Sequence, residues 1–247
     1  MNLVIDVGNT RTKYACFDDN KMLCVGYREE DIVQTMREFK SQGYSIYVLL
    51  SGSNYLSGAI LDDIRLEAFW FYEFDSLIDL PIKLAYLKRC ELGRDRIADC
   101  VGALTMFCNI PLLVIDCGTC ITYNYMDDNR CFLGGSIAPG LNMRFRSLHE
   151  YTAALPLVEP IVFDDNFKSY DNVGNSTEKA IQIGVMQGVV YEINGYINDF
   201  IIKNPTGKVV ITGGSVHSFV NELDYVAVYI GELGLIGLNA ILNFSLC

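Results

Sequence analysis

The sequence predicts an α/β fold built from two related lobes. Three observations support this: a short motif occurs twice, strand-length apolar runs alternate with segments of helical periodicity, and the composition suits a large core. The chain has 247 residues, of which 51% are hydrophobic and 20% are charged. That is enough apolar material for one large core or two small ones. Strands that alternate with helices are typical of α/β proteins.

The duplicated motif carries the prediction of two lobes. Residues 3–17 and 113–126 both begin Leu-Val-Ile-Asp and continue through a turn that contains Gly and Thr into a second β-prone run. This pattern is typical of a β-hairpin. Asp6 and Asp116 lie close to half a chain length apart. Two unrelated hairpins are the alternative, but the recurrence in register favours lobes over residues 1–111 and 112–247.

The remaining elements follow from periodicity and from turn residues. We expect helices over residues 31–40, 99–108, 177–202 and 234–244, where apolar residues recur at helical spacing. Buried strands are expected over residues 46–50 and 208–212. A strand near residues 131–133 should end in a turn over residues 134–140, which are rich in Gly and Pro.

Charge and hydropathy exclude several classes of protein. The formal net charge of −11 argues against non-specific nucleic-acid binding, because phosphates would be repelled. The opening apolar run stops at Asp6, which is too short for a signal-peptide core. No apolar run approaches the roughly 18 residues of a membrane span. We therefore expect a soluble, cytoplasmic protein without a nucleic-acid or membrane partner.

The cysteines indicate reduced thiols. Nine cysteines, an odd number, are scattered along the chain, which does not suit a disulfide framework. Cys117 and Cys120 form a C-x-x-C motif, but no second pair and no histidine cluster accompanies it, so a redox or zinc site is disfavoured. His149 and His217 are interpreted as structural or surface residues.

The first turn of the repeat is a candidate phosphate loop. Gly8 would let the backbone approach an anion, and consecutive turn N–H groups can form an anion-binding nest. Asn9 and Thr10 add neutral donors, and Lys13 adds a cation. Asp6 cannot bind phosphate directly and would instead hold Mg²⁺. The alternative is an ordinary Asx-type turn.

The turn after Asp116 is expected to form the other half of the same phosphate-binding site. Thr119 can donate to a terminal phosphate, and Asp116 can bind a cation. Two such hairpins facing each other across a cleft would grip a triphosphate. Thr212-Gly213-Gly214 ends a strand at which an adenosine could lie against bare backbone. The Walker motif and the dinucleotide-binding G-x-G-x-x-G motif are both absent.

A third segment offers acid–base chemistry. Arg94 and Arg96 flank Asp95 in what we predict to be a turn before a helix. The basic pair could clamp a substrate carboxylate, and Asp95 could accept the proton of a substrate hydroxyl during phosphoryl transfer. On spacing alone, a surface helix N-terminus with salt bridges is the favoured alternative.

Taken together, these motifs resemble those of type III pantothenate kinases, in order and spacing across nearly the whole chain. The resemblance rests on Asp6-Val7-Gly8-Asn9-Thr10 with Lys13, Gly93-x-Asp95-Arg96, Asp116-x-Gly118-Thr119-x-x-Thr122, Gly134-Gly135-x-Ile137-x-Pro139-Gly140, Ser176-Thr177-x-x-Ala180-x-Gln182-x-Gly184 and Thr212-Gly213-Gly214. It implies ATP-dependent phosphorylation of pantothenate to 4′-phosphopantothenate, the first step of coenzyme A synthesis. It also implies an actin/Hsp70-like fold of two ribonuclease H-like lobes with mixed sheets, Mg²⁺ with ATP, and K⁺ or NH₄⁺. A further implication is a homodimer with active sites at the interface.

The resemblance also implies roles for individual residues. The nucleotide phosphate loop would comprise Asp6, Val7, Gly8, Asn9, Thr10, Arg11, Thr12 and Lys13, with Thr119 also touching ATP. Asp95 would be the general base, Asp116 would bind the monovalent cation and Asp6 would serve Mg²⁺. The pantothenate contacts would be Tyr86, Gly93, Asp95, Arg96 and Thr177, with Arg96 pairing to the carboxylate. Arg94, the other member of the basic pair, is a further candidate contact.

The sequence departs from the family pattern at three positions. Arg94 replaces a small or apolar residue, Cys120 replaces Ala, and Arg89 stands where Pro is common. None of these removes a proposed chemical group. Two other functions stay open: a kinase of the same superfamily for another small molecule, and a non-catalytic regulator with this fold.

Overall fold

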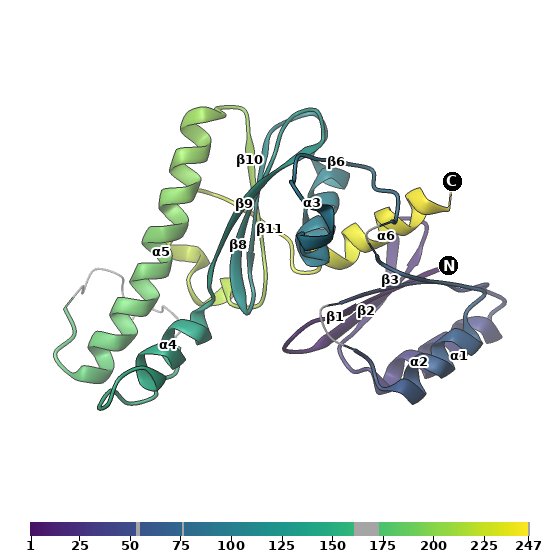
Figure 1. Cartoon of the computed structure of the whole chain (residues 1–247), viewed down its shortest axis with the longest axis horizontal. Helices are drawn as coiled ribbons and strands as arrows, with labels where there is room; N and C mark the ends of the chain where they lie inside the picture. Colours follow the sequence, from purple (N-terminus) through teal and green to yellow (C-terminus); the bar gives the residue numbers. More distant parts are fainter. Residues whose placement is uncertain (53–54, 76, 161–172, 247) are drawn as a thin grey trace. The chain divides into compact units, whose positions relative to one another are not determined.

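A computed structural model describes residues 1–52, 55–75, 77–160 and 173–246 (Figure 1). Contacts between residues divide the chain into two compact units. The first unit is Met1–Cys108, Asn129–Leu133 and Glu232–Cys247, and the second is Asn109–Asp128 and Gly134–Gly231. This grouping differs from the ranges 1–111 and 112–247, because the last helix and the start of one strand pack with the first unit.

The first unit is a five-stranded sheet with helices on both faces. The strand order is β3-β2-β1-β4-β5, with β1 antiparallel to β2 and parallel to β4. The strands are β1 Asn2–Val7, β2 Thr12–Asp18, β3 Lys21–Gly26, β4 Tyr47–Gly52 and β5 Trp70–Glu73. Helices α1 Glu30–Ser41 and α2 Gly58–Glu67 pack on the apolar core of this sheet, and α3 Arg94–Met106 and α6 Leu233–Ser245 pack on each other and on β1 and β4.

The second unit repeats this sheet. Its strand order is β9-β8-β7-β10-β11, with β7 antiparallel to β8 and parallel to β10. The strands are β7 Leu112–Cys117, β8 Cys120–Met126, β9 Cys131–Pro139, β10 Lys208–Thr212 and β11 Val228–Tyr229. Helices α4 Leu141–Glu150 and α5 Thr177–Lys203 supply side chains to its core. The short strand β6, Lys83–Leu84, pairs with Cys131 and Phe132 of β9, which belong to the first unit.

The matching strand orders explain the duplicated sequence motif. In each unit the hairpin supplies the central strand and its antiparallel neighbour, and a later strand adds in parallel on the other side. The prediction of an α/β fold with two related lobes and mixed sheets is therefore confirmed.

Most of the predicted helices are confirmed, and two predictions near turns are wrong. Helix α3 begins at Arg94 instead of residue 99, so Asp95 lies inside its first turn. The turn expected over residues 134–140 is instead a continuation of β9 as far as Pro139. Strand β6 pairs only with Cys131 and Phe132, at the start of β9. Pro139, at the far end of β9, is tolerated because proline lacks an N–H and can occupy a strand position where no neighbouring strand needs that donor.

None of the helices that the structure describes combines the length and the apolarity that a membrane span needs.

Candidate active site

Asp6 lies at the end of the central strand of the first unit. Its register partners are Lys13 on β2 and Ser51 on β4, and Ser51 is buried. The turn that follows is closed by a hydrogen bond from the Gly8 backbone N–H to the Arg11 carbonyl at 3.2 Å. The tip of this turn is exposed to solvent at Asn9. The first hairpin therefore presents a carboxylate, an ammonium group and an open turn at one end of the sheet.

The carboxyl group of Asp6 is electrostatically perturbed. Burial raises its pKa to about 6, repulsion from Asp95 adds to the rise, and Lys13 opposes it. Asp6 and Asp95 are thus close enough to interact, although they are far apart in the sequence. The first unit brings together two carboxylates and one ammonium group of the predicted site.

The first turn of α3 positions Asp95. Its Oδ1 accepts a hydrogen bond from the backbone N–H of Arg96 at 2.9 Å, and the side chain is exposed. Gly93 is the N-cap residue, and a Cβ there would lie 2.4 Å from Asp95 Oδ1. Glycine therefore leaves room for the carboxylate. Arg94 is also exposed, and its Nη1 donates to the carbonyl of Gly52 at 3.3 Å.

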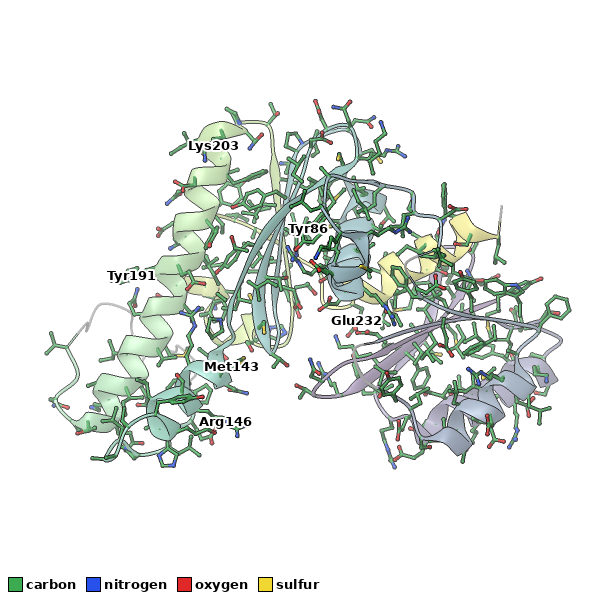
Figure 2. All side chains as sticks on the ribbon, viewed as in Figure 1. Tyr86, Met143, Arg146, Tyr191, Lys203 and Glu232 are labelled. Atoms are coloured by element: carbon green, nitrogen blue, oxygen red, sulfur yellow. The ribbon has the colours of Figure 1, made fainter. Side chains whose placement is uncertain are left out.

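Arg96 is buried, so a surface salt bridge at a helix end does not describe it. Only 4% of the residue is exposed, and its guanidinium carbon lies 5.4 Å from the ring centre of Phe132. The ring of Tyr86 lies 6.0 Å from the same ring, and Figure 2 labels Tyr86. The Phe132 ring therefore contacts both Arg96 and Tyr86, two of the predicted substrate contacts. Sequence reasoning missed Phe132, because a buried aromatic residue on a strand carries no separate signal.

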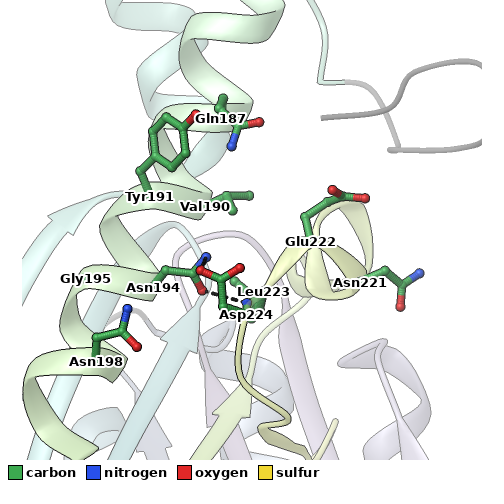
Figure 3. A pocket seen from close by; sticks show the side chains of 10 residues that line it. All are labelled: Gln187, Val190, Tyr191, Asn194, Gly195, Asn198, Asn221, Glu222, Leu223 and Asp224. Carbon is green, nitrogen blue, oxygen red and sulfur yellow. Dashed lines mark hydrogen bonds between the residues drawn. The ribbon is translucent and has the colours of Figure 1, made fainter. Parts of the chain in front are cut away.

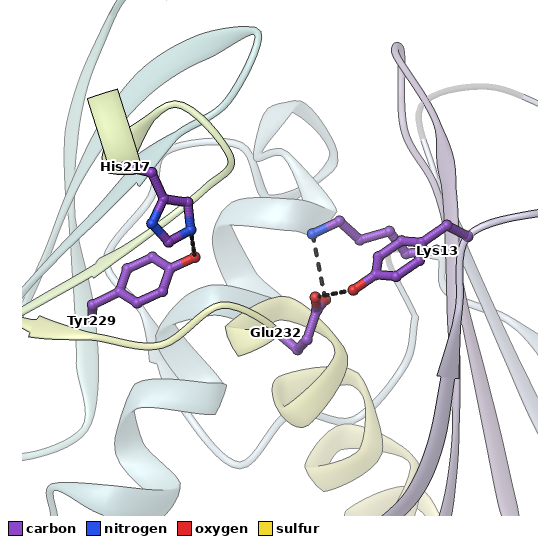
Figure 4. A network of polar contacts seen from close by, with 5 residues as sticks. Lys13, His217, Tyr229 and Glu232 are labelled. Atoms are coloured by element: carbon purple, nitrogen blue, oxygen red, sulfur yellow. Dashed lines mark hydrogen bonds and ion pairs between the residues drawn. The ribbon is translucent and has the colours of Figure 1, made fainter. Parts of the chain in front are cut away.

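Glu232 was also missed and belongs to the same unit. Its Oε2 lies 3.4 Å from Nζ of Lys13, as Figure 4 shows, and its Oε1 accepts a hydrogen bond from the Tyr27 hydroxyl at 2.7 Å. The Arg11 guanidinium stacks over Tyr27, 5.1 Å from the ring centre. Glu232 is distant from all three residues in sequence, so no local pattern could have revealed the cluster.

The second hairpin has a tighter turn and neutral neighbours. Asp116 lies between Thr122 on β8 and Thr212 on β10, both of which are buried. The Gly118 N–H donates to the Cys120 carbonyl at 3.0 Å, and Thr119 is exposed.

A glycine also shapes the end of β10. Gly213 has φ +98°, and a Cβ there would lie 2.5 Å from the Cys117 carbonyl carbon and 2.6 Å from Asp116 Oδ1. Only glycine allows this close approach.

Helix α4 is fastened to the second hairpin by hydrogen bonds. The Gly140 N–H donates to the Thr119 carbonyl at 3.1 Å. Arg144 donates to the carbonyl of Pro139 at 2.8 Å and to Glu192 at 2.7 Å. Glu192 also accepts from the Tyr123 hydroxyl at 2.8 Å, and burial raises the pKa of Tyr123. This network fixes the start of α4 beside the Thr119 backbone.

The remaining predicted contact, Thr177, belongs to the second unit. It is the exposed first residue of α5, and the preceding Ser176 caps the helix by accepting from the Lys179 N–H at 3.3 Å. Tyr86, Asp95 and Arg96 belong to the first unit.

A separate polar pocket lies between α5 and residues 221–224, as Figure 3 shows. Its volume is about 490 Å³, and none of the predicted site residues lines it. The lining residues are Gln187, Val190, Tyr191, Asn194, Gly195, Asn198, Asn221, Glu222, Leu223 and Asp224.

Two cysteines lie in the second hairpin, and the two histidines make local contacts. Cys117 is buried and Cys120 is partly exposed. Nδ1 of His149 lies 2.8 Å from the Leu155 carbonyl oxygen, and Nε2 of His217 lies 3.1 Å from the Tyr229 hydroxyl. Within the described ranges no three His, Cys, Asp or Glu side chains gather in a way that could hold a metal ion.

Comparison with solved structures defines the fold. A Listeria monocytogenes protein described as a candidate N-acetylmannosamine kinase superposes with a TM-score of 0.54 at 14% identity, covering 100% of this chain and 99% of that one. The activator of 2-hydroxyisocaproyl-CoA dehydratase from Clostridium difficile, solved with bound ADPNP, gives 0.50 at 12% identity, covering 98% and 93%. These similarities establish the two-lobed actin/Hsp70-like fold.

The family follows from sequence comparison. The model of the family "Type III pantothenate kinase" matches residues 2–199. A Bacteroides fragilis protein named type III pantothenate kinase is 37% identical, covering 99% of this chain and 98% of that protein. A protein of the same name from Cytophaga hutchinsonii is 35% identical and covers 99% and 100%. The chain belongs to the type III pantothenate kinase family.

Proposed function

We propose that this protein transfers the γ-phosphoryl group of ATP to the 4′-hydroxyl of pantothenate and so begins coenzyme A synthesis. Family membership supports the substrates. The observation that carries the mechanism is the electrostatic interaction between Asp6 and Asp95, which links the predicted phosphate loop to the predicted base. A base for the acceptor hydroxyl must act close to the phosphates, because phosphoryl transfer joins the two.

Asp95 acts in this proposal as the general base. Its exposed carboxylate is oriented by the Arg96 N–H and can accept the proton of the hydroxyl as the new O–P bond forms. Arg96 pairs with the pantothenate carboxylate. Its buried guanidinium is supported by the face of Phe132, so little side-chain freedom remains to be lost on binding.

Lys13 and the turn after Asp6 bind the nucleotide phosphates. Lys13 supplies a positive charge, and the open turn supplies backbone and side-chain donors. Glu232 is a positioning residue for Lys13, since it holds the ammonium group at 3.4 Å. Thr119 contributes a further hydroxyl donor from the second hairpin.

The carboxylates of the first unit fit a role for Mg²⁺. Burial and repulsion from Asp95 both raise the pKa of Asp6, and a divalent cation beside Asp6 would favour its ionised form against both. When bound, Mg²⁺ would neutralise charge on the phosphates. Asp6 is the residue proposed to hold it.

The second hairpin fits a monovalent cation. Asp116 offers a carboxylate, and the hydroxyl groups of its register neighbours Thr122 and Thr212 are oxygen donors. Hard oxygen ligands suit K⁺, and the single carboxylate also suits NH₄⁺. We propose Asp116 as the ligand of this cation.

We further propose a cytoplasmic homodimer. The large apolar side chains that the second unit exposes include Ile137 at 62%, Met143 at 44% and Tyr191 at 59%, and Figure 2 labels Met143 and Tyr191. Exposed apolar side chains of this size are candidates for contacts with a second copy of the chain. Light scattering on the purified protein should give twice the chain mass, and Tyr191→Glu should lower it.

An activity assay tests the proposed reaction. Purified protein with Mg-ATP, K⁺ and pantothenate should release ADP above a blank without pantothenate, and mass spectrometry should detect pantothenate that has gained one phosphate. ADP release equal to the blank overturns the proposal. Turnover with another alcohol of a substrate panel, but not with pantothenate, would identify a different kinase of this superfamily. Absence of ATP binding by calorimetry would indicate a non-catalytic protein.

A further inference from the structure

Two cysteines lie directly opposite each other in the first unit. Cys16 on β2 and Cys24 on β3 are register partners in an antiparallel pair. Directly opposite residues of such a pair have Cα atoms about 4.5–5.5 Å apart, which is inside the range of about 4.4–6.8 Å that a disulfide bridges. A register shift follows directly after Cys16, so Cys16–Cys24 is the last pair before the irregularity. The Cα separation expected for such a pair suits a disulfide.

The two side chains also share a face of the sheet. Cys16 is a member of the core cluster that contains Ile32 and Met36 of α1, and Cys24 packs against the same cluster. Interaction between the two thiols lowers the pKa of Cys24 and raises the pKa of Cys16, and burial adds to the rise at Cys16. The thiolate of the pair therefore forms at Cys24.

Exposure differs between the partners. Cys16 is fully buried, whereas Cys24 is partly exposed. An accessible thiolate with a second thiol behind it is the arrangement of a redox-sensitive pair, because the second thiol resolves the first oxidation product.

We propose that Cys16 and Cys24 form a reversible redox site, which a hydroperoxide oxidises to an intramolecular disulfide. The Cys24 thiolate attacks the peroxide, the O–O bond breaks, and Cys24 becomes a sulfenic acid while hydroxide leaves and takes up a proton. The Cys16 sulfur then attacks the Cys24 sulfur, and its own proton leaves with the displaced hydroxide as water. Two thiols lose two electrons in total, and hydrogen peroxide is reduced to two molecules of water.

Among the residues that the structure describes, the other cysteines do not share this arrangement. Cys117 and Cys120 match a redox motif in sequence, but Cys117 pairs in register with Ile121. Burial raises the pKa of both Cys100 and Cys117, so neither offers the thiolate that would attack a peroxide first. Cys90 and Cys108 are exposed and serve as internal references for oxidant dose.

Peptide mapping of the full chain tests the proposal. The reduced protein is treated with increasing hydrogen peroxide until Cys90 and Cys108 are oxidised, the remaining thiols are alkylated, and the protein is digested with trypsin without reductant. Because Lys21 lies between the two cysteines, trypsin separates them into peptides 14–21 and 22–28. A disulfide should join these peptides, at a mass two hydrogens below their sum, and dithiothreitol should release them.

Variants provide the controls. The joined peptides should persist in Cys120→Ser, a partly exposed cysteine of the second hairpin, and disappear in Cys24→Ser. In Cys16→Ser, a sulfenic-acid probe should accumulate at Cys24, because the resolving thiol is missing. Peptide mapping of the wild-type chain tests the proposal by itself, even if a variant fails to fold. If Cys90 and Cys108 are oxidised while peptides 14–21 and 22–28 stay separate, the redox site does not exist. This result is independent of kinase activity.

Discussion

The two hairpins begin with the same four residues, yet they are built for different tasks. Burial and, to a lesser extent, repulsion from Asp95 raise the pKa of Asp6 to about 6, while its register partner Lys13 opposes the rise. Asp116 lies between two buried threonines and beneath the backbone of Gly213. The first hairpin works through charge, and the second works through shape and neutral oxygen atoms.

The comparison also reveals a second pair of equivalent residues. Ser51 is the register partner of Asp6, Thr212 is the register partner of Asp116, and each is followed by a glycine. A Cβ on Gly52 would lie 2.6 Å from the Val7 carbonyl oxygen, much as a Cβ on Gly213 would crowd Cys117. The duplicated unit therefore includes the neighbouring parallel strand, and the hydroxyl–glycine pair allows its close approach.

The largest expected effect is on kcat and concerns Asp95, the carboxylate that interacts with Asp6 of the first hairpin. Asp95→Asn should keep the fold, since an amide oxygen can still accept from the Arg96 N–H, but it should lower kcat by about 10²–10⁴ because the base is lost. Steady-state kinetics with pantothenate measures this. Glu91→Gln, an exposed carboxylate shortly before α3, is the matched control and should stay near the parent rate. Full activity of Asp95→Asn contradicts the assignment.

The next effect tests the role of shape at the second hairpin. Gly213→Ala should destabilise the protein by about 2–3 kcal/mol, because it combines a positive φ with a Cβ inside van der Waals distance of Cys117 and Asp116. Urea unfolding measures the change. Gly184→Ala on α5 is the control: its Cβ would enter open space, so stability should rise slightly. Equal behaviour of the two variants would remove the shape argument.

A third prediction concerns the raised pKa of Asp6. A carboxyl with a folded-state pKa above its ordinary value stabilises the protein at low pH, and this contribution is lost as pH rises through about 6. Asp6→Asn should therefore have little effect on the free energy of unfolding at pH 4 and raise it by up to about 2 kcal/mol at pH 7.5. Urea unfolding at the two pH values decides this, with exposed Asp18→Asn as the control. A pH-independent difference would show that Asp6 is not perturbed.

The smallest expected effect concerns Lys13 and Thr122, the residues that pair in register with Asp6 and Asp116. Lys13→Met should raise the KM for ATP about tenfold, because a phosphate contact is lost, and should move the acid limb of the pH profile upward, because Lys13 opposes the rise in the pKa of Asp6. Thr122→Val changes the equivalent register position of the second hairpin and should leave that limb in place. Identical pH profiles for the two variants would contradict the proposal that the two hairpins differ in charge.

Local sequence was sufficient for the repeated hairpins, the helices α1, α5 and α6 and the identity of the family. These features depend on periodicity, turn residues and motif spacing, all of which act over a few neighbouring positions. The exact start of α3 was not predictable in this way. Its first turn is polar and carries no apolar periodicity, so Asp95 and Arg96 read as residues of a loop.

Tertiary structure alone decided which distant groups meet. Glu232 reaches Lys13 and Phe132 supports Arg96 only because strands and helices pack in a particular register and order. Side chains that come together in this way leave no mark on local composition, since packing can join any two positions of the chain. The convergence of both hairpins on one nucleotide stays a prediction, and it rests on the motif repeat that the sequence displays.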